Sequence, residues 1–228
     1  VMAVNNETGA VYDLKAVRAV INRSGCGAFL HCDAVQGFMK RADMKMLLES
    51  AGTAAVAAHK LHAPRGVGAL MVRGGIRLQP YIYGGGQERG LRSGTENVAG
   101  AVAVAAAAAE YTQEKLFAVS AVRERLVKRL SEAGRVGFNV PENHIEGILN
   151  ISLYGIKSET ALNCLSAQEI YVSASSACSS KKGHSAVLAA YGLEKAALDS
   201  ALRIGISPYN TVDEADALAN ALITARER

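Results

Sequence analysis

Short apolar runs alternate with amphipathic helical patterns along the first part of this chain. Residues 1–4 and 28–30 are apolar runs that lead into polar side chains, and residues 14–21 and 44–51 repeat apolar side chains at helical spacing. A third apolar run follows at residues 54–57. Because parallel strands need a crossover, usually a helix, this order predicts a mainly parallel sheet covered on both faces. The predicted fold class is α/β, of the doubly wound kind.

The sequence beyond residue 60 adds two further features. Residues 67–72 and 76–82 resemble two strands joined by a Gly74-Gly75 turn, which predicts a hairpin. Residues 95–133 contain few helix breakers, so we expect one long helix or two successive helices that link two domains. The alternation that follows indicates a small α+β domain. Its expected elements are strands at residues 148–153, 171–173 and 202–206 and helices at 159–165, 185–191 and 212–225.

Composition excludes several classes of function. The chain has 228 residues, half of them hydrophobic, and its net charge of +4 is spread out, so we expect no nucleic-acid partner. The apolar residues 98–109 are too few to cross a bilayer, and residues 1–7 lack the features of a signal peptide. We therefore expect no membrane association and a cytoplasmic location. The four cysteines are far apart and form no CxxC pair, which favours a reducing compartment.

Polar side chains follow the first three apolar runs. They are Asn6, Asp33 and the pair His59 and Lys60. In open α/β sheets, ligands bind beyond the carboxyl ends of the strands. These four residues are therefore candidates for one shared site.

Lys60 comes directly after an apolar run. Burial at such a position lowers the pKa of an amine and makes it a plausible Schiff-base nucleophile. A solvated surface lysine is the alternative, and His59 with His62 could instead suggest a metal pair. The local sequence lacks further metal ligands, so we predict no metal site.

Asp33 and Gln36 are spaced so that both side chains can face one ligand from the start of a helix. A carboxylate against a pyridinium nitrogen keeps that nitrogen protonated, as the chemistry of pyridoxal phosphate requires. The alternative is that Asp33 is a helix N-cap.

A glycine-rich polar segment at residues 84–95 precedes the long helical region. Its backbone amides and Thr95 could hold a phosphate group, although the segment matches neither the dinucleotide-binding nor the P-loop pattern. A flexible interdomain loop is the alternative.

Cys178 stands among small and polar residues between a predicted strand and a predicted helix. A cysteine in such a loop is accessible, and Lys181 and Lys182 would favour its thiolate. An inert, small core residue is the alternative.

Seven segments, taken together and in order, resemble the cysteine desulfurases, in the class V branch of fold-type I pyridoxal-phosphate enzymes. The sequence GGGQERGLRSGTEN at residues 84–97 is nearly a signature of that family by itself. The other segments are VNNETG at 4–9, HCDAVQ at 31–36, HK at 59–60 with PRGVGAL at 64–70, NIS at 150–152, SACSS at 176–180 and LRI at 202–204.

The resemblance implies a fold and a domain division. Residues 1–110 would be the C-terminal part of the large domain, which binds pyridoxal phosphate. Residues 111–228 would be the small α+β domain that carries the catalytic cysteine loop.

The resemblance also assigns cofactor contacts. Lys60 would carry the cofactor covalently and move the α-proton of the substrate. Asp33 would pair with the pyridinium nitrogen, Gln36 with the phenolic oxygen and His59 with the phosphate. Thr95 would reach the phosphate of a neighbouring subunit, which implies an intertwined homodimer.

The implied reaction converts L-cysteine to L-alanine. Asn6 and Arg203 would hold the substrate carboxylate. Asn6 would also contact the cofactor. Cys178 would attack the substrate sulfur and keep it as a persulfide for a sulfur-acceptor or scaffold protein, in iron–sulfur cluster or thio-cofactor biosynthesis. A selenocysteine lyase, another class V aminotransferase and a noncatalytic truncated module are the alternatives.

The chain departs from the family pattern in several places. Roughly the first third of the family's length, with a phosphate loop and a ring-stacking histidine, has no counterpart in this sequence. Ala57 replaces a phosphate-binding serine, Ala174 replaces a glycine, and Ser207 follows Arg203 later than usual. We therefore expect the 228-residue chain to bind the cofactor weakly or not at all.

Overall fold

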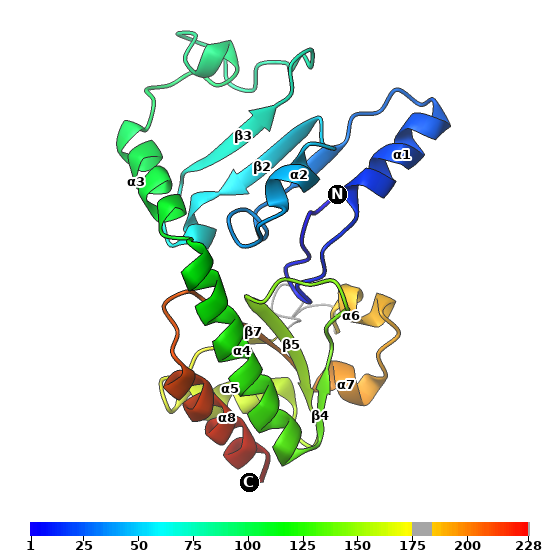
Figure 1. The fold of residues 1–228 in the computed structure, drawn as a ribbon, viewed down its shortest axis with the longest axis vertical. Helices are drawn as coiled ribbons and strands as arrows, with labels where there is room; N and C mark the ends of the chain where they lie inside the picture. Colours follow the sequence, from blue (N-terminus) through cyan, green and yellow to red (C-terminus); the bar gives the residue numbers. More distant parts are fainter. Residues whose placement is uncertain (175–183, 228) are drawn as a thin grey trace. The chain divides into compact units, whose positions relative to one another are not determined.

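The computed structural model describes residues 1–174 and 184–227 (Figure 1). The chain forms two compact units, and each is described by itself. The first unit contains Val1–Val4 and Tyr12–Tyr111, and the second contains Asn5–Val11 and Thr112–Arg228. The functional roles expected for residues 1–110 and 111–228 remain predictions.

A three-stranded mixed sheet forms the centre of the first unit. Its strands are β1 (His31–Asp33), β2 (Thr53–Ala57) and β3 (Gly68–Val72), in the order β1-β2-β3. β1 runs parallel to β2, with Cys32 opposite Ala54, and β3 runs antiparallel to β2. The parallel pair has the crossover that the alternating sequence predicted.

Local signals set the helices of the first unit. α1 (Leu14–Ser24) begins at Asp13, whose carboxylate accepts a hydrogen bond from the Ala16 amide at 3.0 Å, and ends at Gly25 in the left-handed region. The other helices of this unit are α2 (Met44–Leu48), the 3₁₀ turns η1 (Ala58–Leu61) and η2 (Glu88–Gly90), and α3 (Val98–Ala109).

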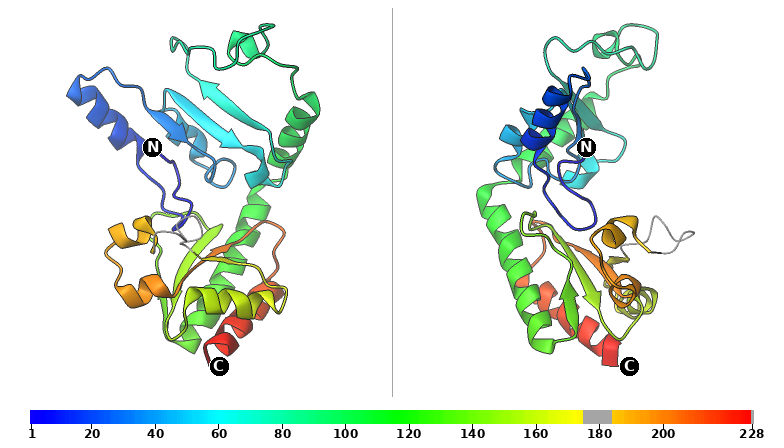
Figure 2. Two further views of the ribbon diagram at one scale, coloured as in Figure 1. Left: turned by 180° about the vertical axis from the view of Figure 1, so that it is seen from behind. Right: turned by 90° about the vertical axis from the view of Figure 1, so that its right-hand side faces the viewer.

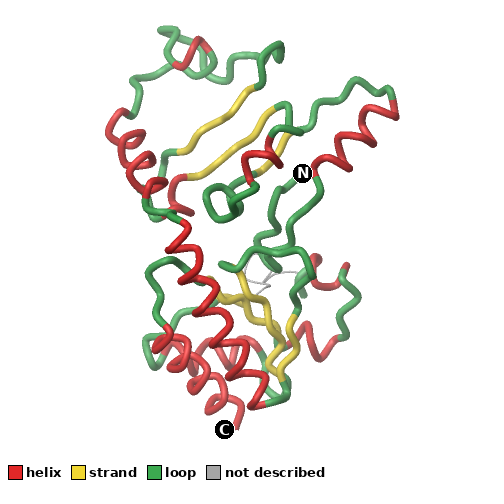
Figure 3. The backbone as a smooth tube through the Cα atoms, in the orientation of Figure 1, coloured by secondary structure: helices red, strands yellow, loops and turns green. Residues whose placement is uncertain are grey.

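The expected hairpin after β3 is wrong. Residues 76–82 form no strand; Ile82 makes an isolated bridge to Arg92, and the Tyr81 amide donates to Leu91 O at 2.8 Å. Pro80 has no N–H to give to a ladder, and its neighbours Tyr81 and Ile82 bond to the glycine-rich loop. Figure 3 shows the loop that joins β3 to α3.

Residues 1–4 only partly form the expected strand. Met2 makes an isolated parallel bridge to Asp33, and the Ala3 amide donates to Asp33 O at 2.8 Å. The run is too short to form a full ladder before the chain enters the second unit at Asn5.

The second unit contains a four-stranded antiparallel sheet. Its strands are β4 (Val136–Phe138), β5 (Ile148–Leu153), β6 (Ser173–Ala174) and β7 (Ala201–Gly205), in the order β4-β5-β7-β6. All six residues of β5 are buried. Leu149, Ile151 and Leu153 alternate with polar residues, so β5 has one apolar face and one that carries Asn150 and Ser152.

Helices cover the apolar face of this sheet. They are α4 (Gln113–Ala133), α5 (Ser158–Ser166) and α8 (Val212–Glu227). The unit also contains α6 (Ala186–Ala190) and α7 (Lys195–Asp199), and α7 meets the polar Ser152 of β5. α4 and α8 lie side by side, as Figures 1 and 2 show. Leu126 of α4, Leu165 of α5 and Leu222 of α8 join Leu149 and Ile151 in one buried core.

Most expected elements are confirmed. Two helices, α3 and α4, occupy residues 95–133, and the strand expected at 148–153 is found with those bounds. β4 and α7 were not expected from the sequence. The α/β class is confirmed, with mixed pairing in the first sheet. No helix among the described residues is long and apolar enough to span a membrane.

Arg123 of α4 fixes the helix to the loop before β5. Its side chain is 7% exposed, its Nη1 donates to Ile148 O at 2.7 Å and Glu146 O at 3.2 Å, and its Nε lies 3.2 Å from Glu146 Oε2. Burial of a charge is tolerated only when such partners replace water.

We expect Arg123→Met to lower the free energy of unfolding by about 2–4 kcal/mol, because two carbonyls lose a buried charged donor and the half-exposed Glu146 loses its ion-pair partner. Arg129→Met is the matched control on the same helix. Its side chain is 32% exposed near Asp216, so we expect a loss below about 1 kcal/mol. Urea unfolding measures both, and equal losses would contradict the structural role of Arg123.

Candidate functional site

The carboxyl ends of β1 and β2 bring four of the predicted site residues to one edge of the first sheet. Asp33 is the last residue of β1 and Gln36 follows in the next turn, while His59 and Lys60 lie in η1, directly after β2. Because β1 and β2 are parallel neighbours, both connections leave the sheet at this edge.

Asp33 has a local structural role. Its Oδ1 accepts a hydrogen bond from the Val35 amide at 2.9 Å, which holds the turn after β1. The carboxylate has a second oxygen that this bond does not use. The expected helix start is wrong, because residues 35–40 form turns, so Asp33 caps a turn and not a helix. Its second oxygen leaves it free for a role toward a ligand.

The Gln36 amide is available to bind a ligand. Gln36 is buried, at 9% exposure, and its side chain has no hydrogen-bond partner among the described residues. Its amide nitrogen and oxygen are not among the fully buried, unbonded atoms of the described residues, so the amide is accessible to solvent or to a ligand. A ligand with a polar ring substituent fits this amide and the neighbouring carboxylate, so the residues present are compatible with pyridoxal phosphate.

Lys40 is a functional candidate that the sequence did not reveal, and its charge acts on His62, which the sequence suggested only as part of a metal pair. The pKa of Lys40 is lowered to about 8, mainly by burial and to a smaller extent by the positive charge of Lys60. The pKa of His62 is also lowered, mainly by burial and to a smaller extent by the charge of Lys40. The edge that carries Lys60 is therefore rich in positive charge. In the sequence, Lys40 is marked only by its position shortly after the Asp33–Gln36 segment. That position does not reveal that its side chain is buried.

Metal binding receives no support from the described residues. Within residues 1–174 and 184–227, no group of three or more His, Cys, Asp or Glu side chains could hold a metal ion. His59 is exposed, and His62 ends η1 in the left-handed region.

The glycine-rich loop is held by its own hydrogen bonds. The Gly94 amide donates to Gln87 Oε1 at 3.1 Å, and the Gly86 amide donates to Ser93 Oγ at 3.4 Å. Thr95 is exposed and precedes Asn97, whose side chain caps α3 by accepting from the Gly100 amide at 2.9 Å. Thr95 is thus accessible to a neighbouring molecule, although its role stays a prediction.

In the second unit, the structure brings Asn6 and Arg203 together. Arg203 Nη1 donates to Asn6 O at 3.2 Å, and Arg203 Nη2 donates to Ser173 Oγ at 3.3 Å. A guanidinium has five N–H donors, so others remain for a carboxylate. Cys178 lies outside the described residues.

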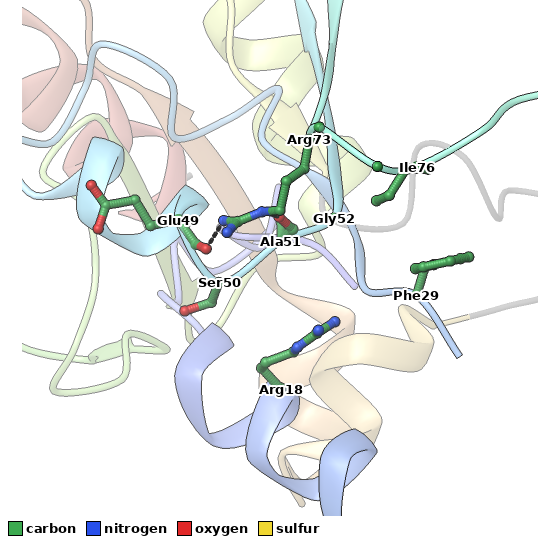
Figure 4. Close-up of a pocket in the computed structure, with 10 residues that line it drawn as sticks. Arg18, Phe29, Glu49, Ser50, Ala51, Gly52, Arg73 and Ile76 are labelled. Atoms are coloured by element: carbon green, nitrogen blue, oxygen red, sulfur yellow. Dashed lines mark hydrogen bonds between the residues drawn. The ribbon is translucent and has the colours of Figure 1, made fainter. Parts of the chain in front are cut away.

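A pocket of about 500 Å³ lies at the opposite edge of the first sheet (Figure 4). Its lining includes Arg18, Phe29 and Gly52, which precedes β2. Arg73 donates hydrogen bonds there to Glu49 O and, at 3.1 Å, to Ala51 O. The pocket contains none of the predicted site residues.

Nearly the whole chain is similar to proteins of one known family. Residues 1–218 match the family described as aminotransferase class-V. A NifS/IcsS protein homolog of Lactobacillus delbrueckii subsp. bulgaricus is 36% identical over 95% of this chain and 57% of its own length. A cysteine desulfurase of Gluconacetobacter diazotrophicus is 36% identical over 97% of this chain and 56% of its own length.

A solved structure described as a NifS-like protein has a TM-score of 0.86 and 34% identity, and the match covers 98% of this chain and 59% of that one. The chain thus spans somewhat more than half the length of these proteins.

Lys40 generates a test of the electrostatics at this edge. Its folded-state pKa of about 8 is below the ordinary 10.5, so between these values the unfolded chain binds more protons and stability rises with pH. We expect Lys40→Met to raise the free energy of unfolding at pH 7 by about 2 kcal/mol, and this gain to shrink toward pH 10.5.

Urea unfolding across this pH range measures the effect of Lys40→Met. Lys45→Met, at an exposed position on α2, controls for the loss of a lysine. Destabilisation by Lys40→Met at pH 7, or a gain that persists at pH 10.5, would refute the assignment.

Proposed function

The chain belongs to the aminotransferase class-V family, and we propose that the protein to which it belongs is a pyridoxal-phosphate-dependent cysteine desulfurase. The observation that carries the cofactor assignment is the placement of Asp33 and Gln36 after β1 and of Lys60 after its parallel neighbour β2, at one edge of the sheet. The similarity to proteins named cysteine desulfurase supports the reaction.

In this proposal, the chain's own residues hold and orient the cofactor. Asp33 keeps the ring nitrogen protonated, Gln36 donates to the phenolic oxygen and His59 contacts the phosphate, with Thr95 serving a neighbouring subunit of a homodimer. Bound pyridoxal phosphate supplies an electron sink for the α-carbon of the substrate. Lys60 holds the cofactor and then moves the substrate's α-proton.

The substrate is L-cysteine, and its carboxylate is held by Asn6 and Arg203. The hydrogen bonds from Arg203 to Asn6 O and Ser173 Oγ support this role, because they restrict the guanidinium and leave donors for the substrate.

Sulfur transfer needs a soft nucleophile, and we assign it to Cys178. Its thiolate attacks the substrate sulfur, the new S–S bond forms as the C–S bond breaks, and the bond electrons return to the substrate carbon. Protonation of that carbon then leaves L-alanine, and Cys178 carries a persulfide. The persulfide passes to an acceptor or scaffold protein for iron–sulfur cluster or thio-cofactor assembly, in the cytoplasm.

The proposal predicts one added sulfur on Cys178 after incubation with L-cysteine and excess pyridoxal phosphate, together with release of L-alanine. Mass spectrometry of the intact protein and of its peptides measures the adduct. Lys60→Ala should abolish both products, since the cofactor lysine is lost.

Cys178→Ala should abolish the adduct, whereas the matched control Cys164→Ala should keep it. Sulfide release that survives Cys178→Ala would contradict the persulfide route and favour a selenocysteine lyase. Rapid transamination would favour an aminotransferase, and a complete absence of products would indicate a noncatalytic module.

A further inference from the structure

The turn at residues 5–8 of the second unit has a conformation fixed by its own side chains. Asn5 is buried, and its Oδ1 accepts hydrogen bonds from the Glu7 amide at 2.9 Å and the Thr8 amide at 3.0 Å. Gly9 follows with φ +76°, and a Cβ there would lie 3.1 Å from Ile148 O. The turn therefore sits close to β5 in one defined conformation.

Two neighbouring strand residues hold this turn. Asn150 of β5 and Arg203 of β7 are direct partners in the sheet register. Asn150 Nδ2 donates to Glu7 O at 3.1 Å, and Arg203 Nη1 donates to Asn6 O at 3.2 Å. Because Asn150 is fully buried, the position of the turn is tied to the register of the sheet.

The Glu7 side chain forms a separate contact. Its Oε2 accepts a hydrogen bond of 2.5 Å from Ser185 Oγ, and the same hydroxyl accepts from the Leu188 amide to cap α6. Ser185 is buried, at 4% exposure. A short hydrogen bond to a carboxylate is among the stronger side-chain contacts.

The neighbouring ion pair makes a useful comparison. His184 Nε2 lies 2.6 Å from Asp199 Oδ1, but both side chains are more than a third exposed. Solvent screening reduces the contribution of such pairs. Among these two contacts, Glu7–Ser185 is the one that can fix the start of α6.

Ser173 and Ser185 flank the segment at residues 175–183, which contains Cys178. Ser173 is bonded to Arg203, which also holds Asn6, and Ser185 is bonded to Glu7. Both flanks are therefore connected to the same pair of consecutive residues, Asn6 and Glu7.

We propose that Glu7 is a positioning residue for sulfur transfer, which fixes Ser185, on the C-terminal side of the cysteine-containing segment, relative to Arg203. The inference rests on the proposed function. Glu7 itself neither binds substrate nor transfers a proton, so its loss should slow the step in which Cys178 takes the sulfur and should leave cysteine binding intact.

The experiment compares steady-state kinetics of L-alanine formation for Glu7→Ala, Glu7→Gln and the unmodified protein. We expect Glu7→Ala to lower kcat about tenfold and to change KM for cysteine less than about twofold. A tenfold effect is what the loss of one hydrogen bond to a charged group would cause. Glu7→Gln keeps an acceptor for Ser185, so kcat should return to within about threefold. Glu124→Ala, at an exposed position on α4, should match the unmodified protein.

A double-mutant cycle tests the contact without cofactor. Glu7→Ala and Ser185→Ala should each lower the folding equilibrium constant severalfold. The decrease in the double variant should be much smaller than the product of the two single decreases. Additive losses, an unchanged kcat in Glu7→Ala, or a change confined to KM would overturn the inference.

The two readouts separate this inference from the proposed function. If the unmodified protein forms no L-alanine, the desulfurase function fails, and the role of Glu7 in sulfur transfer fails with it, even where the cycle shows coupling. If L-alanine forms at a rate that Glu7→Ala does not change, only the role of Glu7 fails.

Discussion

The parallel pairing of β1 with β2 is the constraint on which the candidate cofactor site depends. Cys32 lies opposite Ala54 and Asp33 opposite Ala55, so the connections after both strands leave the sheet at the same edge. An antiparallel pairing would have sent Asp33 and Lys60 to opposite ends. The edge gains its chemistry only because the sequence places an acid, an amide and an amine directly after these two strands.

Burial gives that edge its electrostatic character. Lys40 is held where water solvates its ammonium poorly, and the charge of Lys60 adds to the penalty. A group that is costly to keep charged lowers stability, and proteins tolerate such costs most often at functional sites. This reasoning favours the edge over the pocket lined by Arg18 and Phe29, where Arg73 binds backbone carbonyls of its own unit.

Side-chain periodicity predicted the elements that are long enough to show a period, such as β5 and α8. It failed where one residue or one distant contact decides the conformation. Within residues 76–82, Tyr81 and Ile82 bond to the glycine-rich loop and not to β3. β4 has three residues, too few to reveal a pattern, and α7 was missed although α6, of the same length, was expected. The burial of Lys40 could not be predicted either, because it depends on packing that no local sequence pattern records.

The polar face of β5 shows why the turn at residues 5–8 belongs to the second unit. Asn150 and Ser152 are fully buried, and buried polar groups are costly unless they are bonded. Ser152 Oγ donates to Ala197 O at 2.9 Å, and Asn150 Nδ2 donates to Glu7 O. An apolar segment could cover this face but could not satisfy the Asn150 amide. The carbonyl of the turn does so, and the same contact places Asn6 beside Arg203. The candidate substrate-binding pair is therefore a consequence of how the second unit satisfies its own buried polar groups.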